Sequence, residues 1–335
     1  MLKKIRWGLL STANINRRLI PAIRQSERGE LVAVASRTSE SATAYAKKWD
    51  IPLAFSTYQE MLDSGAVDAV YIALPNHLHA EWSIKAMQSD LHVLCEKPFA
   101  LTLDDIDAMI TVQKETGKIL AEAFMYRHHP QTKIAGDLVQ SGRLGEVTVF
   151  RGIFNFSMNP KGRDKINPNV RLVPDWGGGS LWDVGIYPLS FAQYIFGCPP
   201  NWVFGSQWIG EFGVDETFCG QMGYAGGGLA QISSAFRSPF HTHVEIIGTE
   251  GRLEITRPFT GLEDNQRRLT LFKPDGEAQE IPIIDEYLYL GEINDMHTSI
   301  LDNTPNYLTL AETRNHVKTV LALYESAKNG KTVQL

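Results

Sequence analysis

An ionisable pair, Glu96-Lys97, directly follows the apolar run 92–95 in this chain of 335 residues. The run is typical of a short buried strand, and Pro98 ends it at once. In an open α/β sheet, ligands bind at the carboxyl ends of the strands, so an ionisable pair there is a candidate site. When a Glu-Lys pair occurs in isolation, it more often marks a strand end with a solvated lysine. Its interpretation therefore depends on the elements around it.

A second candidate is the segment 177–187, in which three consecutive glycines precede Asp183 and Tyr187. If the segment is helical, these two side chains are four residues apart and lie on one face. A carboxylate and a phenol on one face could bind and deprotonate a hydroxyl group, beside glycines that allow another group to approach closely. Without further context, a half-exposed Asp and a packed Tyr are the commoner explanation.

From residue 5 to about 125, apolar runs of strand length alternate with amphipathic segments of helix length. Continuously apolar strands in such an alternation indicate a parallel sheet covered on both faces. We therefore expect an α/β, doubly wound (Rossmann) nucleotide-binding domain over 1–126. The expected strands are 5–10, 31–36, 69–74, 91–95 and 119–124, and the clearest helices are 39–49, 77–88 and 103–116.

After residue 130 the pattern changes to consecutive strands joined by tight turns, which indicates an α+β domain with a largely antiparallel open sheet over 127–335. An open sheet must cover its outer face, so we expect a homodimer or homotetramer through it. The expected strands are 146–156, 202–209, 216–224, 229–236, 243–247, 252–255 and 269–272, and the expected helices are 131–140, one opened by the glycines, 290–302 and 308–328.

The turn after the first strand should carry a dinucleotide fingerprint, but it reads Ser11-Thr12-Ala13-Asn14-Ile15 in place of G-x-G-x-x-G. As a pattern match it fails. A helix N-terminus still offers free backbone N–H groups and a positive dipole end, Ala13 adds only a methyl group, and the two hydroxyls could donate hydrogen bonds to a pyrophosphate. A plain capped turn remains the alternative.

The end of the second strand, Ser36-Arg37, indicates which cofactor such a domain would bind. An NAD-binding domain places an acidic residue there for the ribose 2′-hydroxyl, whereas a hydroxyl and a guanidinium suit a 2′-phosphate. NADP is therefore favoured over NAD, provided that the preceding turn binds a nucleotide.

The composition does not favour a nucleic-acid or membrane partner, because the net charge is −6 and Lys and Arg are scattered. No apolar stretch approaches the roughly 18 residues of a membrane span. Cys95, Cys198 and Cys219 are odd in number and far apart, which indicates a cytoplasmic location. His77 and His79 do not share a helix face, and the other histidine pairs lack carboxylates at metal spacing, so we expect no metal.

Three motifs together resemble the GFO/IDH/MocA oxidoreductases, a family named after glucose–fructose oxidoreductase, inositol dehydrogenase and a rhizopine-catabolism protein. They are 75–79, 96–98 and 177–187, which occur in the family's order and spacing, and the likeness covers nearly the whole chain. Within the family, 7–13 and 123–127 look most like the NADP-dependent branch of dihydrodiol dehydrogenase, D-xylose dehydrogenase and glucose–fructose oxidoreductase, which tolerates the missing glycines.

The resemblance implies that Lys97 lies beside the nicotinamide and the reacting carbon, with a cis bond to Pro98. It also implies that Tyr187 transfers the proton, where inositol-dehydrogenase-like members carry His, and that Asp183 binds a neighbouring hydroxyl. Arg171 would reach cofactor or substrate, although a surface position explains it equally well. The residues predicted to bind the cofactor are Ser11, Thr12, Ala13, Asn14, Ile15, Ser36, Arg37, Leu74, Pro75, Asn76, His79, Glu96, Lys97 and Arg171.

The expected reaction is reversible hydride transfer between the nicotinamide and a carbinol carbon of a sugar or sugar-like diol. An ammonium near a phenol favours the phenolate, so Lys97 would bring the pKa of Tyr187 from near 10 toward working pH, and the two could titrate as a coupled pair. Two alternatives remain open. A hydrolase of the same fold would keep its cofactor and produce no net change in nicotinamide absorbance, and a cofactor-sensing regulator would lack the lysine or the acid/base residue that this chain retains.

Overall fold

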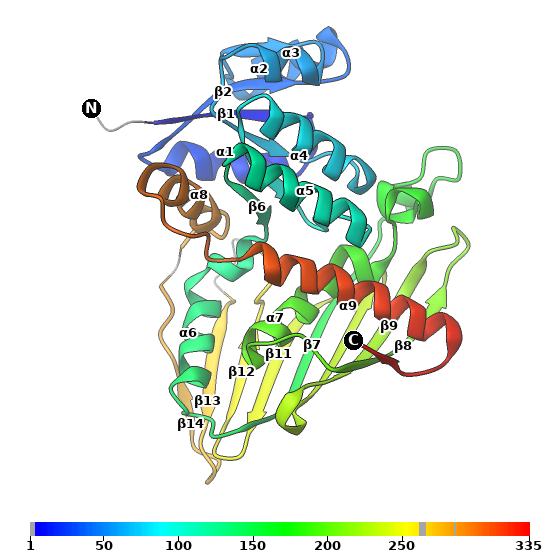
Figure 1. The fold of residues 1–335 in the computed structure, drawn as a ribbon. Helices are drawn as coiled ribbons and strands as arrows, with labels where there is room; N and C mark the ends of the chain where they lie inside the picture. Colours follow the sequence, from blue (N-terminus) through cyan, green and yellow to red (C-terminus); the bar gives the residue numbers. More distant parts are fainter. Residues whose placement is uncertain (1–3, 261–265, 285) are drawn as a thin grey trace. The chain divides into compact units, whose positions relative to one another are not determined.

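The computed structural model describes residues 4–260, 266–284 and 286–335, which form two compact units (Figure 1). The first unit consists of Met1–His128 and Tyr287–Arg314, and the second of His129–Glu286 and Asn315–Leu335. The chain therefore leaves the first unit, returns to it for one helix and its flanks, and ends in the second unit.

The described strands of the first unit form a parallel sheet in the order β3-β2-β1-β4-β5-β6. This is the strand order of a dinucleotide-binding fold, and the predicted Rossmann domain is confirmed. The sequence prediction did not include the short β3. The strands are β1 (Ile5–Leu10), β2 (Gly29–Ala35), β3 (Leu53–Phe55), β4 (Ala69–Ile72), β5 (His92–Glu96) and β6 (Leu120–Ala123).

Local signals explain where the helices of the first unit begin and end. Thr38, Thr57 and Thr102 each accept a hydrogen bond from a first-turn N–H of the helix that follows, and Gly117 ends α5 in a left-handed conformation. The helices are α1 (Asn16–Gln25), α2 (Ser39–Trp49), α3 (Tyr58–Asp63), α4 (His79–Gln88), α5 (Leu103–Thr116) and α8 (Leu290–Asp302), with 3-10 turns η1 (Asn76–Leu78) and η2 (Met125–His128).

The described strands of the second unit pair in the order β14-β13-β12-β11-β7-β10-β9-β8-β15. β10 runs parallel to β7, and every other described pair is antiparallel, so the predicted largely antiparallel sheet is confirmed. The strands are β7 (Val147–Ser157), β8 (Trp202–Ile209), β9 (Asp215–Gly223), β10 (Leu229–Ala235), β11 (Arg237–Gly248), β12 (Arg252–Thr256), β13 (Arg268–Phe272), β14 (Ala278–Glu280) and β15 (Val333–Gln334).

Helices cover one face of this sheet, and glycines on the strands let them approach closely (Figure 1). A Cβ on Gly152 would lie 2.5 Å from Pro188 Cβ, and one on Gly220 would lie 3.1 Å from Leu323. The helices are α6 (Pro130–Gln140), α7 (Ile186–Phe196) and α9 (Leu310–Asn329), and the shorter turns are η3 (Pro160–Arg163), η4 (Val170–Leu172), η5 (Pro174–Trp176), η6 (Leu181–Gly185) and η7 (Ala225–Gly227).

A buried histidine fastens α8 to the Rossmann sheet. His297 is fully buried, its Nε2 accepts a hydrogen bond from Trp7 Nε1 at 2.9 Å, and its Nδ1 lies 3.0 Å from Ser26 Oγ. Ser26 Oγ in turn donates to Asn294 Oδ1, so one neutral imidazole tautomer satisfies every partner. A Cβ on Gly29 would lie 2.9 Å from the ring, which explains the glycine there. Burial lowers the pKa of His297 to about 4.

We predict that acid destabilises the protein through His297. Because its native pKa lies below the unfolded value of about 6.5, the unfolded chain binds the proton better. The neutral His297 side chain contributes its full stabilisation above about pH 7. On acidification to about pH 4, the free energy of unfolding falls by about 3 kcal/mol. Urea unfolding at several pH values should show a weaker pH dependence for His297→Gln and an unchanged one for His241→Gln, at an exposed histidine on β11. Parallel curves for wild type and His297→Gln would contradict the assignment.

Candidate functional site

The turn after β1 keeps a glycine-like backbone although its first residue is serine. Ser11 has a φ of +113°, a conformation that favours glycine. Its hydroxyl donates to Ala73 O at 2.9 Å and accepts from the N–H of Ala13, while Asn16 Nδ2 donates to Ser11 O at 2.8 Å. The side chain that replaces the fingerprint glycine thus stabilises the turn, and its donor hydrogen is used within the protein.

The start of α1 is suited to an anion. The helix has ten residues, and its first turn contains no acidic side chain. Thr12, Ala13 and Asn14, which precede the N-cap residue Ile15, are small or polar. Thr12 and Ala13 are half-buried and Asn14 is exposed, so backbone and side-chain groups of this turn reach solvent. A phosphate at this position would meet the positive end of the helix dipole.

The end of β2 presents a cation. Ser36 is buried, Arg37 and Thr38 are exposed, and the Thr38 hydroxyl accepts from Ser41 N as the N-cap of α2. Burial raises the pKa of the neighbouring Tyr58, and the Arg37 guanidinium partly opposes that rise. Positions 36–39 contain no acidic residue. This donor set fits a ribose 2′-phosphate better than a 2′-hydroxyl.

A buried histidine joins the ends of β4 and β5. His79 is fully buried, with Nδ1 at 2.8 Å from Pro98 O and Nε2 at 2.9 Å from Leu74 O. Burial lowers its pKa. Asn76 lies on η1, beside the same strand end. His79 therefore holds the turn at Lys97 close to the turn after β4.

In the Glu96-Lys97 pair, hydrogen bonds hold the glutamate side chain in place. Glu96 accepts a hydrogen bond from the Tyr71 hydroxyl and another from the backbone N–H of Lys97 at 3.2 Å. Burial raises the pKa of Glu96 and raises that of Tyr71 well above 10. The bond between Lys97 and Pro98 is cis, as the family resemblance predicts.

In the second unit, the predicted helix begins with a π-helical turn. η6 (Leu181–Gly185) has a hydrogen bond from Ile186 N to Leu181 O, and α7 continues from it. The turn carries Asp183, and Tyr187 follows in the first turn of α7. Single π turns inside helices occur frequently at functional sites.

Asp183 and Arg171, for which the sequence predicted separate roles, form an ion pair. Arg171 Nε lies 2.6 Å from Asp183 Oδ2, with 42% of the Arg171 and 12% of the Asp183 side chain exposed. Tyr187 is 5% exposed, and its ring packs 5.4 Å from that of Phe154 and 5.5 Å from that of Phe259. The second unit thus combines a carboxylate, a guanidinium and a restrained phenol along one short stretch of chain.

Gly178 and Gly179, which precede this turn, allow other segments of the same chain to pack closely against them. A Cβ on Gly178 would lie 2.8 Å from the backbone oxygens of Arg171 and Val173. Gly179 has a φ of +124°, and a Cβ there would lie 2.1 Å from Asp215 Oδ1. The close approach that the sequence predicts therefore involves the loop that carries Arg171 and the start of β9.

Comparison with known proteins agrees with this architecture. Residues 5–124 match the GFO/IDH/MocA model described as an oxidoreductase family with an NAD-binding Rossmann fold, and residues 132–254 match the GFO/IDH/MocA C-terminal domain. The chain belongs to the GFO/IDH/MocA oxidoreductase family. This confirms the resemblance carried by the three motifs.

Members of the family with assigned activities resemble the chain over almost its full length. D-Xylose 1-dehydrogenase (NADP(+)) 2 of Haloferax volcanii is 35% identical over 98% of this chain and 99% of that protein. The crystal structure of an aldose–aldose oxidoreductase from Caulobacter crescentus, complexed with glycerol, has a TM-score of 0.90 at 25% identity, covering 99% of this chain and 100% of that one. A 3-ketoreductase from Actinomadura kijaniata, in complex with NADP and TDP-benzene, has a TM-score of 0.88 at 27% identity, covering 97% and 98%.

The sequence analysis did not predict several residues that support the candidate site. Tyr71 and Glu292 lie with Glu96, and burial and the Glu96 carboxylate raise the pKa of Glu292 well above its usual value. Glu216, which is 1% exposed, holds the Arg163 guanidinium through both carboxyl oxygens and so anchors the loop 158–175. The one available signal was a pair of adjacent acids, at 215 and 216, opening an apolar strand.

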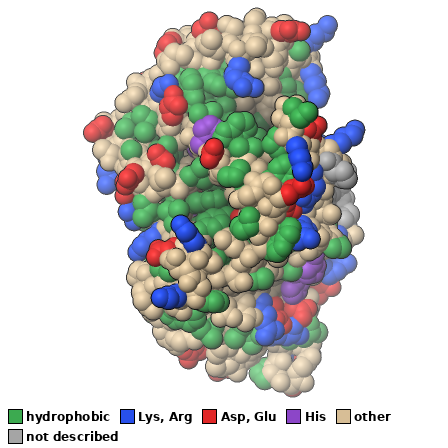
Figure 2. All heavy atoms as spheres, turned by 90° about the vertical axis from the view of Figure 1, so that its right-hand side faces the viewer, with side chains coloured by type: hydrophobic (Ala, Val, Ile, Leu, Met, Phe, Trp, Pro, Cys, Tyr) green, Lys and Arg blue, Asp and Glu red, His purple; other side chains and the backbone are tan. Residues whose placement is uncertain are grey.

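The described residues contain no group of three or more His, Cys, Asp or Glu side chains placed to hold a metal ion. None of the described helices is both long and apolar enough to span a bilayer. Figure 2 shows acidic and basic side chains interspersed on the face that it presents.

Proposed function

We propose that the chain transfers a hydride between NADP and a carbinol or carbonyl carbon of a sugar or sugar-like diol. The observation that carries the proposal is the ion pair between Arg171 and Asp183, which offers a hydrogen-bond donor and an acceptor to neighbouring hydroxyls. Tyr187, four residues after Asp183 in the chain, adds a phenol that can exchange a proton. The sugar-directed and NADP-dependent names of the relatives support the same reaction class.

The cofactor would be held by residues of the first unit. The turn from Ser11 to Ile15 and the start of α1 would bind its pyrophosphate, and Arg37 with Ser36 would bind the 2′-phosphate. Residues at the ends of β4 and β5 would line the remainder, namely Leu74, Pro75, Asn76, Glu96 and Lys97, with His79 fixing their backbone. When bound, the nicotinamide would supply or accept the hydride.

The side chains would handle the proton. Tyr187 exchanges a proton with the substrate hydroxyl, and Asp183 binds the neighbouring hydroxyl. Packing against Phe154 and Phe259 restrains the Tyr187 ring, so little side-chain entropy is lost on reaching a reactive geometry. Arg171 orients the Asp183 carboxylate and shares in binding the diol.

Tyr187→Phe tests the chemical role. The variant keeps the ring and its packing but removes the exchangeable proton, so turnover should fall on the order of 100-fold or more while the dissociation constant for NADPH changes little. Turnover is read from nicotinamide absorbance with aldoses, anhydro-sugars, keto-sugars and aromatic dihydrodiols, and binding from cofactor fluorescence. An unimpaired rate would show that another group moves the proton. Substrate conversion without any net absorbance change in the wild-type protein would favour the hydrolase alternative.

Arg37→Ala tests the cofactor assignment. Loss of a charge-assisted contact to phosphate should weaken NADP binding by about 10-fold or more and leave NAD binding nearly unchanged, since NAD lacks the 2′-phosphate. Titration of both cofactors against wild type and variant, followed by fluorescence, measures the two effects. Equal weakening of NADP and NAD would remove the 2′-phosphate argument.

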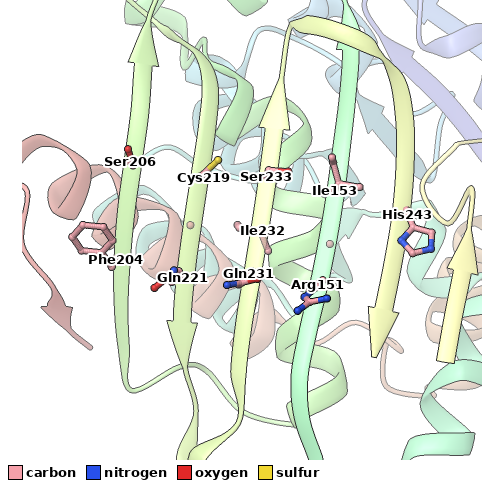
Figure 3. Close-up of a pocket in the computed structure, with 12 residues that line it drawn as sticks. Arg151, Ile153, Phe204, Ser206, Cys219, Gln221, Gln231, Ile232, Ser233 and His243 are labelled. Carbon is pink, nitrogen blue, oxygen red and sulfur yellow. The ribbon is translucent and has the colours of Figure 1, made fainter. Parts of the chain in front are cut away.

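We infer that the uncovered face of the second sheet joins copies of this chain into a homodimer or homotetramer. Its strands carry two adjacent rows of side chains around a hollow of about 410 Å³ (Figure 3). The face also exposes Phe204, Trp208 and Leu229. One row is Ser206, Cys219, Ser233, Ile153 and His243, and the other is Phe204, Gln221, Gln231, Arg151 and Glu245.

A charge placed on this face should break the assembly. Ser233→Glu lies in the middle of one row, where a self-complementary interface would bury it without a partner. Light scattering coupled to size-exclusion chromatography should show a lower mass than for wild type, whereas Thr111→Glu, exposed on α5, should leave the mass unchanged. A wild-type protein that elutes as a monomer would contradict the inference.

We also propose a cytoplasmic location. The support is chemical: the three cysteines are free thiols in the structure, with Cys95 buried and Cys219 exposed, and an exposed thiol persists best in a reducing compartment.

A further inference from the structure

One buried carboxylate in the second unit receives three hydrogen bonds. Asp215, 2% exposed at the start of β9, accepts from the Tyr324 hydroxyl through Oδ1 at 2.7 Å. Its Oδ2 accepts from Ser180 Oγ at 2.7 Å and from the backbone N–H of Leu181 at 2.9 Å. Three elements of the second unit, β9, α9 and the segment that enters η6, therefore meet at this side chain.

The carboxylate caps a helical turn from outside that turn. The first N–H groups of a helix lack partners within it, and Leu181 is the first residue of η6. Asp215 supplies the missing acceptor for Leu181 and also holds the hydroxyl of the preceding Ser180. An acceptor on the residue before a helix does the same in an ordinary N-cap, where its loss destabilises the helix by about 1 kcal/mol.

Neighbouring groups pack closely around Asp215 and its partner Tyr324. Gly179 has positive φ and lacks space for a Cβ, which would meet Asp215 Oδ1 and the Tyr324 hydroxyl. The Tyr324 ring packs 6.0 Å from that of Trp182 and 5.6 Å from that of Phe218. The carboxylate thus has a fixed direction, set by apolar packing on one side and by three donors on the other.

We propose that Asp215 is a positioning residue that fixes the start of the π-helical turn, and through it the direction of Asp183 and Tyr187. This rests on the proposed function, in which those two side chains act on the substrate. The turn begins at the two groups that Asp215 binds, and Asp183 follows Leu181 by two residues. A displacement of the turn by about 1 Å would move both substrate-facing groups together and can lower a catalytic rate on the order of 100-fold.

Other buried hydrogen bonds of α9 provide the matched control. Thr319 Oγ1 accepts from Gln193 Nε2 at 2.9 Å, linking α9 to α7 beyond the π-helical turn. Thr319→Val and Tyr324→Phe each remove one hydrogen-bonded hydroxyl from the same helix. A merely structural role for Asp215 predicts that the two variants behave alike, whereas a positioning role predicts that they differ in turnover.

The experiment compares Asp215→Asn, Tyr324→Phe and Thr319→Val in the full-length protein. We expect kcat to fall on the order of 10-fold to 100-fold in Asp215→Asn and several-fold in Tyr324→Phe, with the dissociation constant for NADPH unchanged. Thr319→Val should lower the melting temperature to a similar extent as Tyr324→Phe but keep wild-type kcat. If Asp215→Asn does not fold, the comparison of kcat between Tyr324→Phe and Thr319→Val tests the proposal. Equal kcat in those two variants would overturn the proposal.

A double variant separates this proposal from the proposed function. If Asp215 acts through Tyr187 and Asp183, adding Asp215→Asn to Tyr187→Phe should lower the residual rate by less than Asp215→Asn lowers the wild-type rate, because one of the two groups that it positions is already absent. Full additivity would overturn the positioning role and leave the function intact. A Tyr187→Phe variant with wild-type kcat would instead overturn the assigned role of Tyr187, and the positioning role with it.

Discussion

Two positions without a side chain, Gly178 and Gly179, let separate segments of the second unit meet at one turn. The backbone at Arg171 packs against the first glycine, and the carboxylate of Asp215 packs against the second. A methyl group at either position would overlap these neighbours, so the ion pair between Arg171 and Asp183 depends on the glycines as much as on the charged groups. The geometry of the turn therefore depends on the close approach of a backbone segment to Gly178 and of a side-chain carboxylate to Gly179.

The first unit uses polar side chains for the same purpose. Ser11, His79 and Glu96 each bind backbone or side-chain groups of a neighbouring strand end, and so hold the carboxyl edge of the parallel sheet in place. Their polar atoms have partners within the protein. Under the proposed function, backbone N–H groups of the turn after β1 and exposed side chains such as Arg37 would contact the cofactor. Rigid support with exposed donors is the arrangement that lowers the entropic cost of binding.

Local signals were sufficient for much of the fold. α2 and α5 have the bounds predicted from the sequence, because a threonine cap lies directly before each helix and a glycine directly follows α5. The contacts of His297 with Trp7 and of Asp215 with Tyr324 join residues 290 and 109 positions apart. The sequence around His297 or Asp215 does not indicate which distant residue each one contacts. Sequence patterns could therefore identify the reactive groups but not the residues that orient them.

The ion pair between Arg171 and Asp183 also bears on which substrates the proposed reaction would accept. A hydroxyl can donate to the carboxylate and accept from the guanidinium at once, so a vicinal diol keeps both charged groups hydrogen-bonded when it displaces water. A carbonyl compound without neighbouring hydroxyls would desolvate the pair and leave Asp183 short of donors. Unpaired polar groups in a binding site discriminate between substrates far more strongly than a missing apolar contact. Preference for polyhydroxylated substrates would then follow from electrostatics at one pair of side chains, whatever the shape of the sugar ring.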